Sequence, residues 1–124
     1  MDADELKKRT QLFGLAIIRF VQTLPGNGSV DILGRQLLKC GTSVGANYRA
    51  ACRAKSNADF IAKLKIVEEE CDESIYWIEL LLKLSLGNLL DLERLKKEAD
   101  EILRIIVASI RMARTRNPKI TNHP

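Results

Sequence analysis

The sequence of 124 residues has almost no histidine, because the only one, His123, is the second residue from its end. Histidine is the general base of most Ser-His-Asp and Cys-His sites and a common metal ligand. Without an imidazole inside the folded part of the chain, no serine or cysteine has an available base that would activate it. We therefore predict that the protein is not an enzyme and that it carries no metal and no other cofactor.

Proline, aromatic residues and long apolar runs are scarce as well. The three prolines, Pro25, Pro118 and Pro124, interrupt no segment with helical periodicity, and aromatic residues make up only 5% of the chain, which predicts an aliphatic core. No stretch approaches the roughly 20 apolar residues that span a membrane. The charged first residues, DADELKKR, also lack the apolar centre of a signal peptide. These absences argue against membrane contact.

The cysteines indicate in which cellular compartment the protein is found. Cys40, Cys52 and Cys71 are odd in number, lack CxxC spacing and lie among apolar or small residues. This pattern favours free thiols over disulfides or a metal site, as in a reducing cytosol. We expect a cytoplasmic protein.

Apolar residues recur at spacings of three and four along four segments, which is the period of an amphipathic helix. Asp2 has the pattern of a capping box, and Ser56 and Asn88 each precede an acid by three residues, as helix N-caps do. The first helix is expected to end at Pro25, the second to run from about 29 to 55, and the third to end with Gly87 in the position after its C-cap.

No segment shows the sustained two-residue alternation of a strand, so the predicted fold class is all-α. Four helices joined by short turns favour antiparallel neighbours, and we expect an up-down-up-down four-helix bundle over residues 1–116, followed by a flexible C-terminal tail at 117–124. One stripe of each helix should form the core. The stripes include Leu82 on the third helix and Ser109 on the fourth.

The net charge of +4 conceals a segmental distribution. Residues 24–56 carry +4 and residues 87–124 carry +3, whereas residues 57–86 carry −4. A net charge of this size permits an anionic partner but does not require one.

Four cations of the second helix, which we call the basic strip, share one side of a helical wheel within about 80° and face away from the apolar stripe. They are Arg35, Lys39, Arg49 and Arg53. Such a strip can contact a phosphate backbone, and the binding would depend on salt because counterions are released. Alternatively, the strip is a solvated face or pairs with the acids at Glu68–Glu73 of the following helix.

A second basic region lies near the end of the chain, where no acid follows Glu101. It comprises the C-terminal arginines Arg111, Arg114 and Arg116. Arg111 and Arg114 also have a structural explanation, because cations stabilise the C-terminal end of a helix, whereas Arg116 is predicted to lie past that end. The basic strip and the C-terminal arginines together lead to the hypothesis that the protein contacts RNA or DNA.

The segment GTSVGAN, residues 41–47, places two glycines inside a predicted helix, where each costs about 1 kcal/mol relative to alanine. One explanation is close packing of helices, within the chain or between subunits, by Gly41, Thr42, Ser43, Gly45 and Asn47. A phosphate-binding loop is less favoured because the Walker pattern needs Lys-Ser/Thr after its second glycine and a strand before its first. Here Ala46 and Asn47 follow.

Two segments resemble a known bacterial family. They are LGRQLLKCGTSVGAN at residues 33–47 and KSNADFIAKLKIVEEECDESIYWIELLLKL at residues 55–84. Both are similar to the four-helix bundle proteins encoded in intervening sequences of 23S rRNA genes. The matching positions are Gly41, Thr42, Ser43, Gly45, Ala46, Asn47, Asp59, Phe60, Tyr76, Trp77, Glu79 and Leu80. Cys40 and the basic YRAACRAKS stretch depart from the family pattern.

The resemblance implies a bundle that assembles as a homopentamer in the form of a ring or barrel, with no known catalysis. It also includes a relative, the accessory protein of diversity-generating retroelements, that binds a reverse transcriptase and nucleic acid. Two hypotheses follow. In the first, the basic strip and the C-terminal arginines contact RNA or DNA phosphates; in the second, the protein is an interaction scaffold that recruits a protein partner such as a nucleic-acid enzyme.

Overall fold

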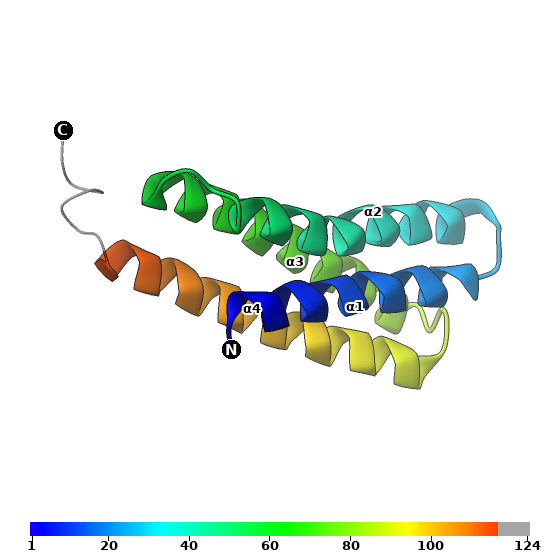
Figure 1. The fold of residues 1–124 in the computed structure, drawn as a ribbon. Helices are drawn as coiled ribbons and strands as arrows, with labels where there is room; N and C mark the ends of the chain where they lie inside the picture. Colours follow the sequence, from blue (N-terminus) through cyan, green and yellow to red (C-terminus); the bar gives the residue numbers. More distant parts are fainter. Residues whose placement is uncertain (117–124) are drawn as a thin grey trace.

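The computed structural model describes residues 1–116 of the chain, and these form four helices (Figure 1). The helices are α1 (Ala3–Gln22), α2 (Gly28–Ala51), α3 (Asn57–Lys83) and α4 (Leu89–Arg116). Each helix packs against its neighbours in the chain, and α4 closes the bundle against α1, where the contact is smallest. The predicted all-α four-helix bundle is confirmed. The predicted tail at 117–124 lies outside the described residues.

Side-chain caps begin three of the helices where the sequence predicts them. The Glu5 amide donates to Asp2 Oδ1 at 2.8 Å, and Glu5 Oε1 accepts from the Asp2 amide at 3.2 Å, which completes a capping box. The Asp59 amide donates to Ser56 Oγ at 3.0 Å. Asn88 Oδ1 likewise accepts from the amide three residues later at 2.9 Å. Each cap satisfies a backbone donor that the helix itself leaves free.

The end of α3 differs from the prediction. The residue in the left-handed conformation directly after the C-cap is Ser85, with φ of 55°, and not Gly87. The Ser85 amide donates to the Leu82 carbonyl at 3.1 Å and the Leu86 amide to the Leu81 carbonyl at 3.0 Å, which is the Schellman pattern. Gly87 follows with φ of 88° and serves packing, because a Cβ there would lie 2.6 Å from Phe20 Cζ.

The end of α2 also differs from the prediction. The helix ends at Ala51 and not near residue 55, so Arg53 lies in the α2–α3 turn. The wheel that placed Arg53 beside the other cations of the strip therefore does not apply to it, although its side chain is exposed. At the other end of the chain, Arg116 belongs to α4, in contrast to the prediction that it lies past the helix.

The core runs along the centre of the bundle and is aliphatic, as predicted. Two expected positions were wrong by one residue: Leu81 is fully buried in place of Leu82, and Ile110 is buried in place of Ser109. Over helices this long, the crossing of the partner helices shifts the buried stripe away from a fixed 100° step. The hydroxyl of Ser109 instead donates to the Ile105 carbonyl at 2.9 Å.

The three cysteines are free thiols. Cys71 is fully buried, and its Sγ donates to the Ala99 carbonyl at 3.2 Å. Burial raises the pKa of the Cys71 thiol to about 12, so this side chain acts as a small apolar residue that joins α3 to α4. Within residues 1–116, no helix combines the length and the apolar character that crossing a bilayer requires.

Candidate nucleic-acid interface

The glycine motif of α2, residues 41–47, packs against α1. A Cβ at Gly41 would lie 2.9 Å from Cγ1 of Ile17, and a Cβ at Gly45 would lie 3.2 Å from the carbonyl oxygen of Thr10. The absence of a side chain at these positions therefore brings the two helices close together. This contact is within one chain.

The polar side chains of the motif bond to their own helix. Thr42 Oγ1 donates to the Leu38 carbonyl at 2.7 Å, and Ser43 Oγ donates to the Lys39 carbonyl at 2.7 Å. Asn47 Nδ2 donates to the carbonyl of Ser43 at 2.9 Å. Since the whole motif is helical, its backbone amides point along the helix and do not form the loop that would cradle a phosphate.

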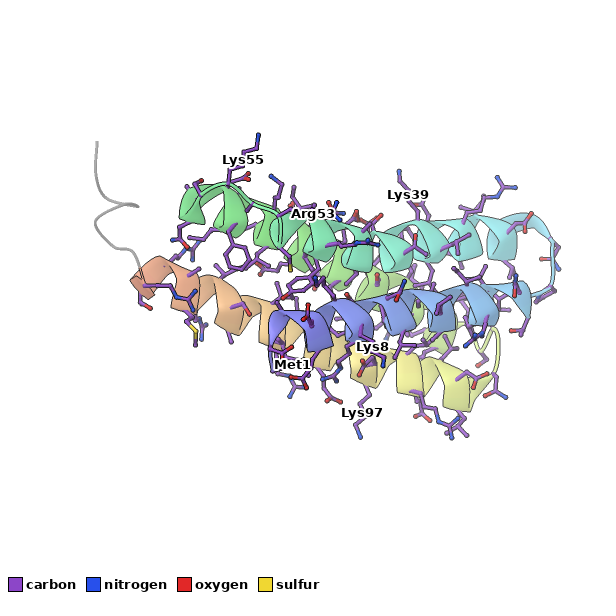
Figure 2. All side chains as sticks on the ribbon, viewed as in Figure 1. Met1, Lys8, Lys39, Arg53, Lys55 and Lys97 are labelled. Atoms are coloured by element: carbon purple, nitrogen blue, oxygen red, sulfur yellow. The ribbon has the colours of Figure 1, made fainter. Side chains whose placement is uncertain are left out.

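All four cations of the basic strip are exposed. Arg35 has a weak partner, because its Nη2 lies 3.7 Å from Asp31 Oδ2 and both side chains are more than half exposed. None of the ion pairs found among the described residues includes Lys39, Arg49 or Arg53. Figure 2 shows Lys39 of α2 pointing away from the bundle, on the side opposite to Lys97 of α4.

The acids of α3 do not neutralise the strip by direct pairing within the chain. Burial and the neighbouring Glu73 raise the pKa of the Glu70 carboxyl, and the attraction of Lys39 offsets this only in part. No ion pair within 4.0 Å joins Lys39 to Glu70. The alternative that the strip pairs with the acids of α3 is therefore supported only by an attraction between Lys39 and Glu70.

The C-terminal arginines are exposed on the last turns of α4. Asn57 Nδ2, at the start of α3, donates to the Ala113 carbonyl at 2.9 Å, which fixes the end of α4 beside the α2–α3 turn. Arg53 of that turn and the C-terminal arginines therefore lie at the same end of the bundle (Figure 1). Arg35 lies far along α2 from that end, so the predicted cations form two regions and not one.

The structure adds cations of α1 that the sequence reasoning missed. Lys7 and Lys8 line a groove between α1 and α2 together with Arg49 of the basic strip. The groove has a volume of about 530 Å³, and we call it the α1–α2 groove. A helical wheel places Lys8 on the outer face of α1, but only the register between the two helices places it near Arg49.

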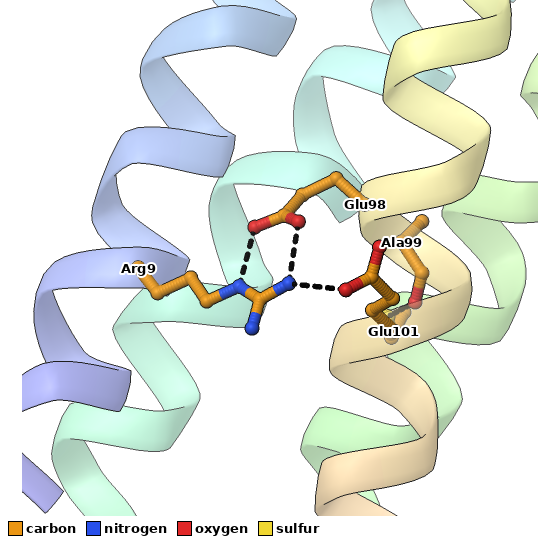
Figure 3. Close-up of polar contacts among 5 residues, drawn as sticks. Arg9, Glu98, Ala99 and Glu101 are labelled. Atoms are coloured by element: carbon orange, nitrogen blue, oxygen red, sulfur yellow. Dashed lines mark hydrogen bonds and ion pairs between the residues drawn. The ribbon is translucent and has the colours of Figure 1, made fainter. Parts of the chain in front are cut away.

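Arg9 lies on the opposite side of α1 and has a structural role. Its Nε and Nη2 each donate to a carboxylate oxygen of Glu98 at 2.7 Å, and Nη2 also donates to Glu101 at 3.0 Å (Figure 3). These hydrogen bonds raise the pKa of the guanidinium. Arg9 is therefore a cation already occupied by α4 and does not belong to the candidate interface.

The model of the 23S rRNA-intervening sequence proteins matches residues 4–108. The chain belongs to the 23S rRNA-intervening sequence protein family. The chain is also similar to a solved structure, with 32% sequence identity and a TM-score of 0.79. That structure is a crystal structure of a protein with unknown function from the S23 ribosomal protein family, from Bacteroides thetaiotaomicron VPI-5482. The similarity covers 85% of this chain and 97% of that one. No curated protein matches the chain.

Membership in the 23S rRNA-intervening sequence protein family confirms the resemblance carried by residues 33–47 and 55–84. Neither the family description nor that of the S23 protein names an enzymatic activity.

Proposed function

We propose that this family member is a non-enzymatic, homo-oligomeric bundle that contacts RNA or DNA phosphates through a basic surface. The surface extends over the two regions described above and comprises Arg35, Lys39, Arg49, Arg53, Arg111, Arg114 and Arg116. We also propose a cytoplasmic location, in keeping with the three free cysteines.

One observation carries the proposal: Lys39, Arg49 and Arg53 are exposed and have no ion-pair partner among the described residues. Cations without partners are available to neutralise phosphates, and each phosphate that they neutralise releases cations condensed on the nucleic acid, which favours binding by entropy. Assembly of several copies would multiply the positive charge of the surface and extend its field.

Exposed apolar side chains support self-association. Leu12 of α1 is 54% exposed and borders a second groove, of about 510 Å³, between α1 and α4. An exposed leucine beside an apolar groove is consistent with a surface that another chain covers. The homopentamer of the family resemblance is the assembly that we propose.

The test is binding of RNA and DNA across a salt series, with a double charge reversal, Arg49→Glu with Arg53→Glu. We expect the logarithm of the affinity to fall linearly with the logarithm of the salt concentration, by about 0.9 per duplex phosphate neutralised. The reversal should weaken binding at every salt concentration. The matched control reverses two exposed cations of α4, Lys97→Glu with Arg104→Glu, and should have a smaller effect. If the affinity depends neither on the salt concentration nor on the Arg49/Arg53 reversal, phosphate contact is disproved.

A second candidate function is an accessory subunit that recruits a protein, such as a reverse transcriptase or another nucleic-acid enzyme. The observation that favours it is the group of leucines around the α3–α4 turn, where Leu84, Leu89 and Leu90 are 57%, 62% and 54% exposed. An apolar tip of this kind is typical of a protein-docking site.

The two candidates differ in which substitutions remove the activity. Under the scaffold hypothesis, Leu89→Ser with Leu90→Ser should abolish capture of a reverse transcriptase and leave the affinity for nucleic acid unchanged. Capture that survives these substitutions would exclude the tip as the docking site. If the Arg49/Arg53 reversal lowers the mass of the particle in light scattering and leaves RNA affinity unchanged, the basic strip is an interface between subunits.

A further inference from the structure

The α1–α2 groove combines positive charge with an apolar wall. Its cations are Lys7, Lys8 and Arg49, and no acid is among the described residues that line it. Lys7 has one partner, Asp4 at 3.2 Å, whose side chain is 92% exposed, so water and salt compete with this pair. A polyanion would therefore find three available cations along one groove.

Small residues keep the groove open. Gly14, Thr42, Gly45 and Ala46 line it, and at Gly45 the two backbones lie close together, because a Cβ there would be 3.2 Å from the Thr10 carbonyl oxygen. Its wall includes Leu15 and Ile18 of α1. At about 530 Å³, the groove falls in the size range of sites that hold small organic ligands, and a nucleotide unit belongs to that class.

We propose that a single-stranded segment of RNA or DNA lies in the α1–α2 groove. Its phosphates contact Lys7, Lys8 and Arg49, and the apolar parts of its sugars and bases lie against Leu15 and Ile18. This inference rests on the proposed function and identifies the path and the strandedness of the nucleic acid. Positively charged grooves that bind single strands follow the backbone with cations and stack the bases on aromatic side chains. The described lining of this groove supplies the cations but no aromatic ring, so Leu15 and Ile18 would provide apolar contact in place of stacking. Duplex binding should therefore depend less on this groove than single-strand binding does.

The decisive variant fills the groove without changing its charge. Ala46 is exposed on α2, so Ala46→Trp places an indole in the groove and leaves the core intact. The matched control is Ala62→Trp, at an exposed alanine of α3 that does not line this groove. With a single-stranded oligonucleotide of about 16 nucleotides, we expect Ala46→Trp to weaken binding about tenfold and Ala62→Trp to stay within about twofold of the original protein.

A second pair of variants measures the charge contribution. Lys8→Gln with Arg49→Gln removes two cations of the groove, and Lys97→Gln with Arg104→Gln removes two exposed cations of α4. The first pair should reduce the slope of log affinity against log salt by about 1.4, which corresponds to two single-strand phosphates. The second pair should leave the slope nearly unchanged.

The outcomes separate this inference from the proposed function. If Ala46→Trp binds as the original protein does while the Arg49/Arg53 reversal weakens binding, the groove is not the path and phosphate contact stands. If neither change weakens binding, both fail. Equal losses for Ala46→Trp and Ala62→Trp, equal weakening of duplex binding by Ala46→Trp, or a smaller particle for Ala46→Trp in light scattering would also overturn the inference. Circular dichroism verifies that each variant is helical.

Discussion

Arg9 of α1 and Glu98 of α4 form a two-pronged contact, with Nε and Nη2 each 2.7 Å from a separate carboxylate oxygen. The contact joins the two helices that otherwise touch least, and Glu101 extends it at 3.0 Å. An ion pair in which one guanidinium binds two carboxylates in fixed geometry is stronger than an exposed ion pair, because the guanidinium donors are held in a planar fork.

Replacement of Arg9 by methionine should lower the free energy of unfolding by about 1–2 kcal/mol, since the charged hydrogen bonds are lost while the aliphatic packing is kept. Arg35→Met is the control, because the Arg35–Asp31 pair is long and exposed, and should change stability by less than about 0.5 kcal/mol. Urea unfolding measures both. Equal effects would show that the Arg9 contact has no special strength.

Two glycines at the contact between α1 and α2, Gly41 and Gly14, should have opposite effects on the free energy of unfolding when each is replaced by alanine. Gly41→Ala places a Cβ 2.9 Å from Ile17, whose side chain is fully buried and cannot move away. Overpacking of this kind outweighs the gain in helix propensity, so we expect a net loss of about 1 kcal/mol. At Gly14 the nearest atom, the Cα of Thr42, is 3.7 Å away. Gly14→Ala should therefore stabilise the protein by up to about 1 kcal/mol. Thermal unfolding of the two variants tests the contrast, which a loss of stability in Gly14→Ala would contradict.

The α3–α4 turn offers a stabilising substitution. Ser85 has φ of 55°, a conformation that is strained for any residue with a Cβ. Ser85→Gly should raise the free energy of unfolding by about 1 kcal/mol. Gly87→Ala should lower it by about 2 kcal/mol, because the new Cβ would meet Phe20 Cζ at 2.6 Å in addition to the strain at φ of 88°. If the two changes shift the urea midpoint in the same direction, this account of the turn is wrong.

The first turn of α3 predicts a pH dependence. The Lys63 ammonium, 2.6 Å from Asp59, and the Lys55 amide lower the pKa of the Asp59 carboxyl below its ordinary value of 3.8. A lowered pKa in the folded state stabilises the fold above the ordinary pKa, and this stability is lost as the pH falls through the lowered pKa. Asp59→Asn should therefore be less stable than the original protein at neutral pH, and the difference should disappear below the lowered pKa. Urea unfolding at several pH values measures it, with the exposed Asp72→Asn as control. If the original protein and Asp59→Asn still differ in stability in strong acid, the charge of Asp59 is not the cause of the difference.

Local signals in the sequence were sufficient for most of the fold. The caps at Asp2, Ser56 and Asn88 depend on residues three positions apart, so they can be recognised without knowledge of the partner helices. The register of the apolar stripe drifted toward the end of α3, where Leu81 is buried and Leu82 was predicted. The left-handed residue after the C-cap of α3, Ser85, was missed because serine is rarely found in that conformation.

The candidate interface was predictable only in part. The wheel of α2 places Arg35, Lys39 and Arg49 on its outer side, and all three are exposed. Lys7 and Lys8 were missed as neighbours of Arg49 because they come from another helix. Arg53 was assigned to a helix that ends two residues earlier.

The sequence by itself determined that this chain forms four amphipathic helices with an aliphatic core, because periodicity, caps and turns act over a few residues. It also placed the cations of α2 away from the core. Only the tertiary structure decided that Arg9 is occupied by Glu98, that Lys39 has no direct partner on α3, and that Lys7, Lys8 and Arg49 share one groove. The physical reason is that charges interact over distances set by how helices pack, and glycines such as Gly41 and Gly45 fix that packing between residues remote in sequence.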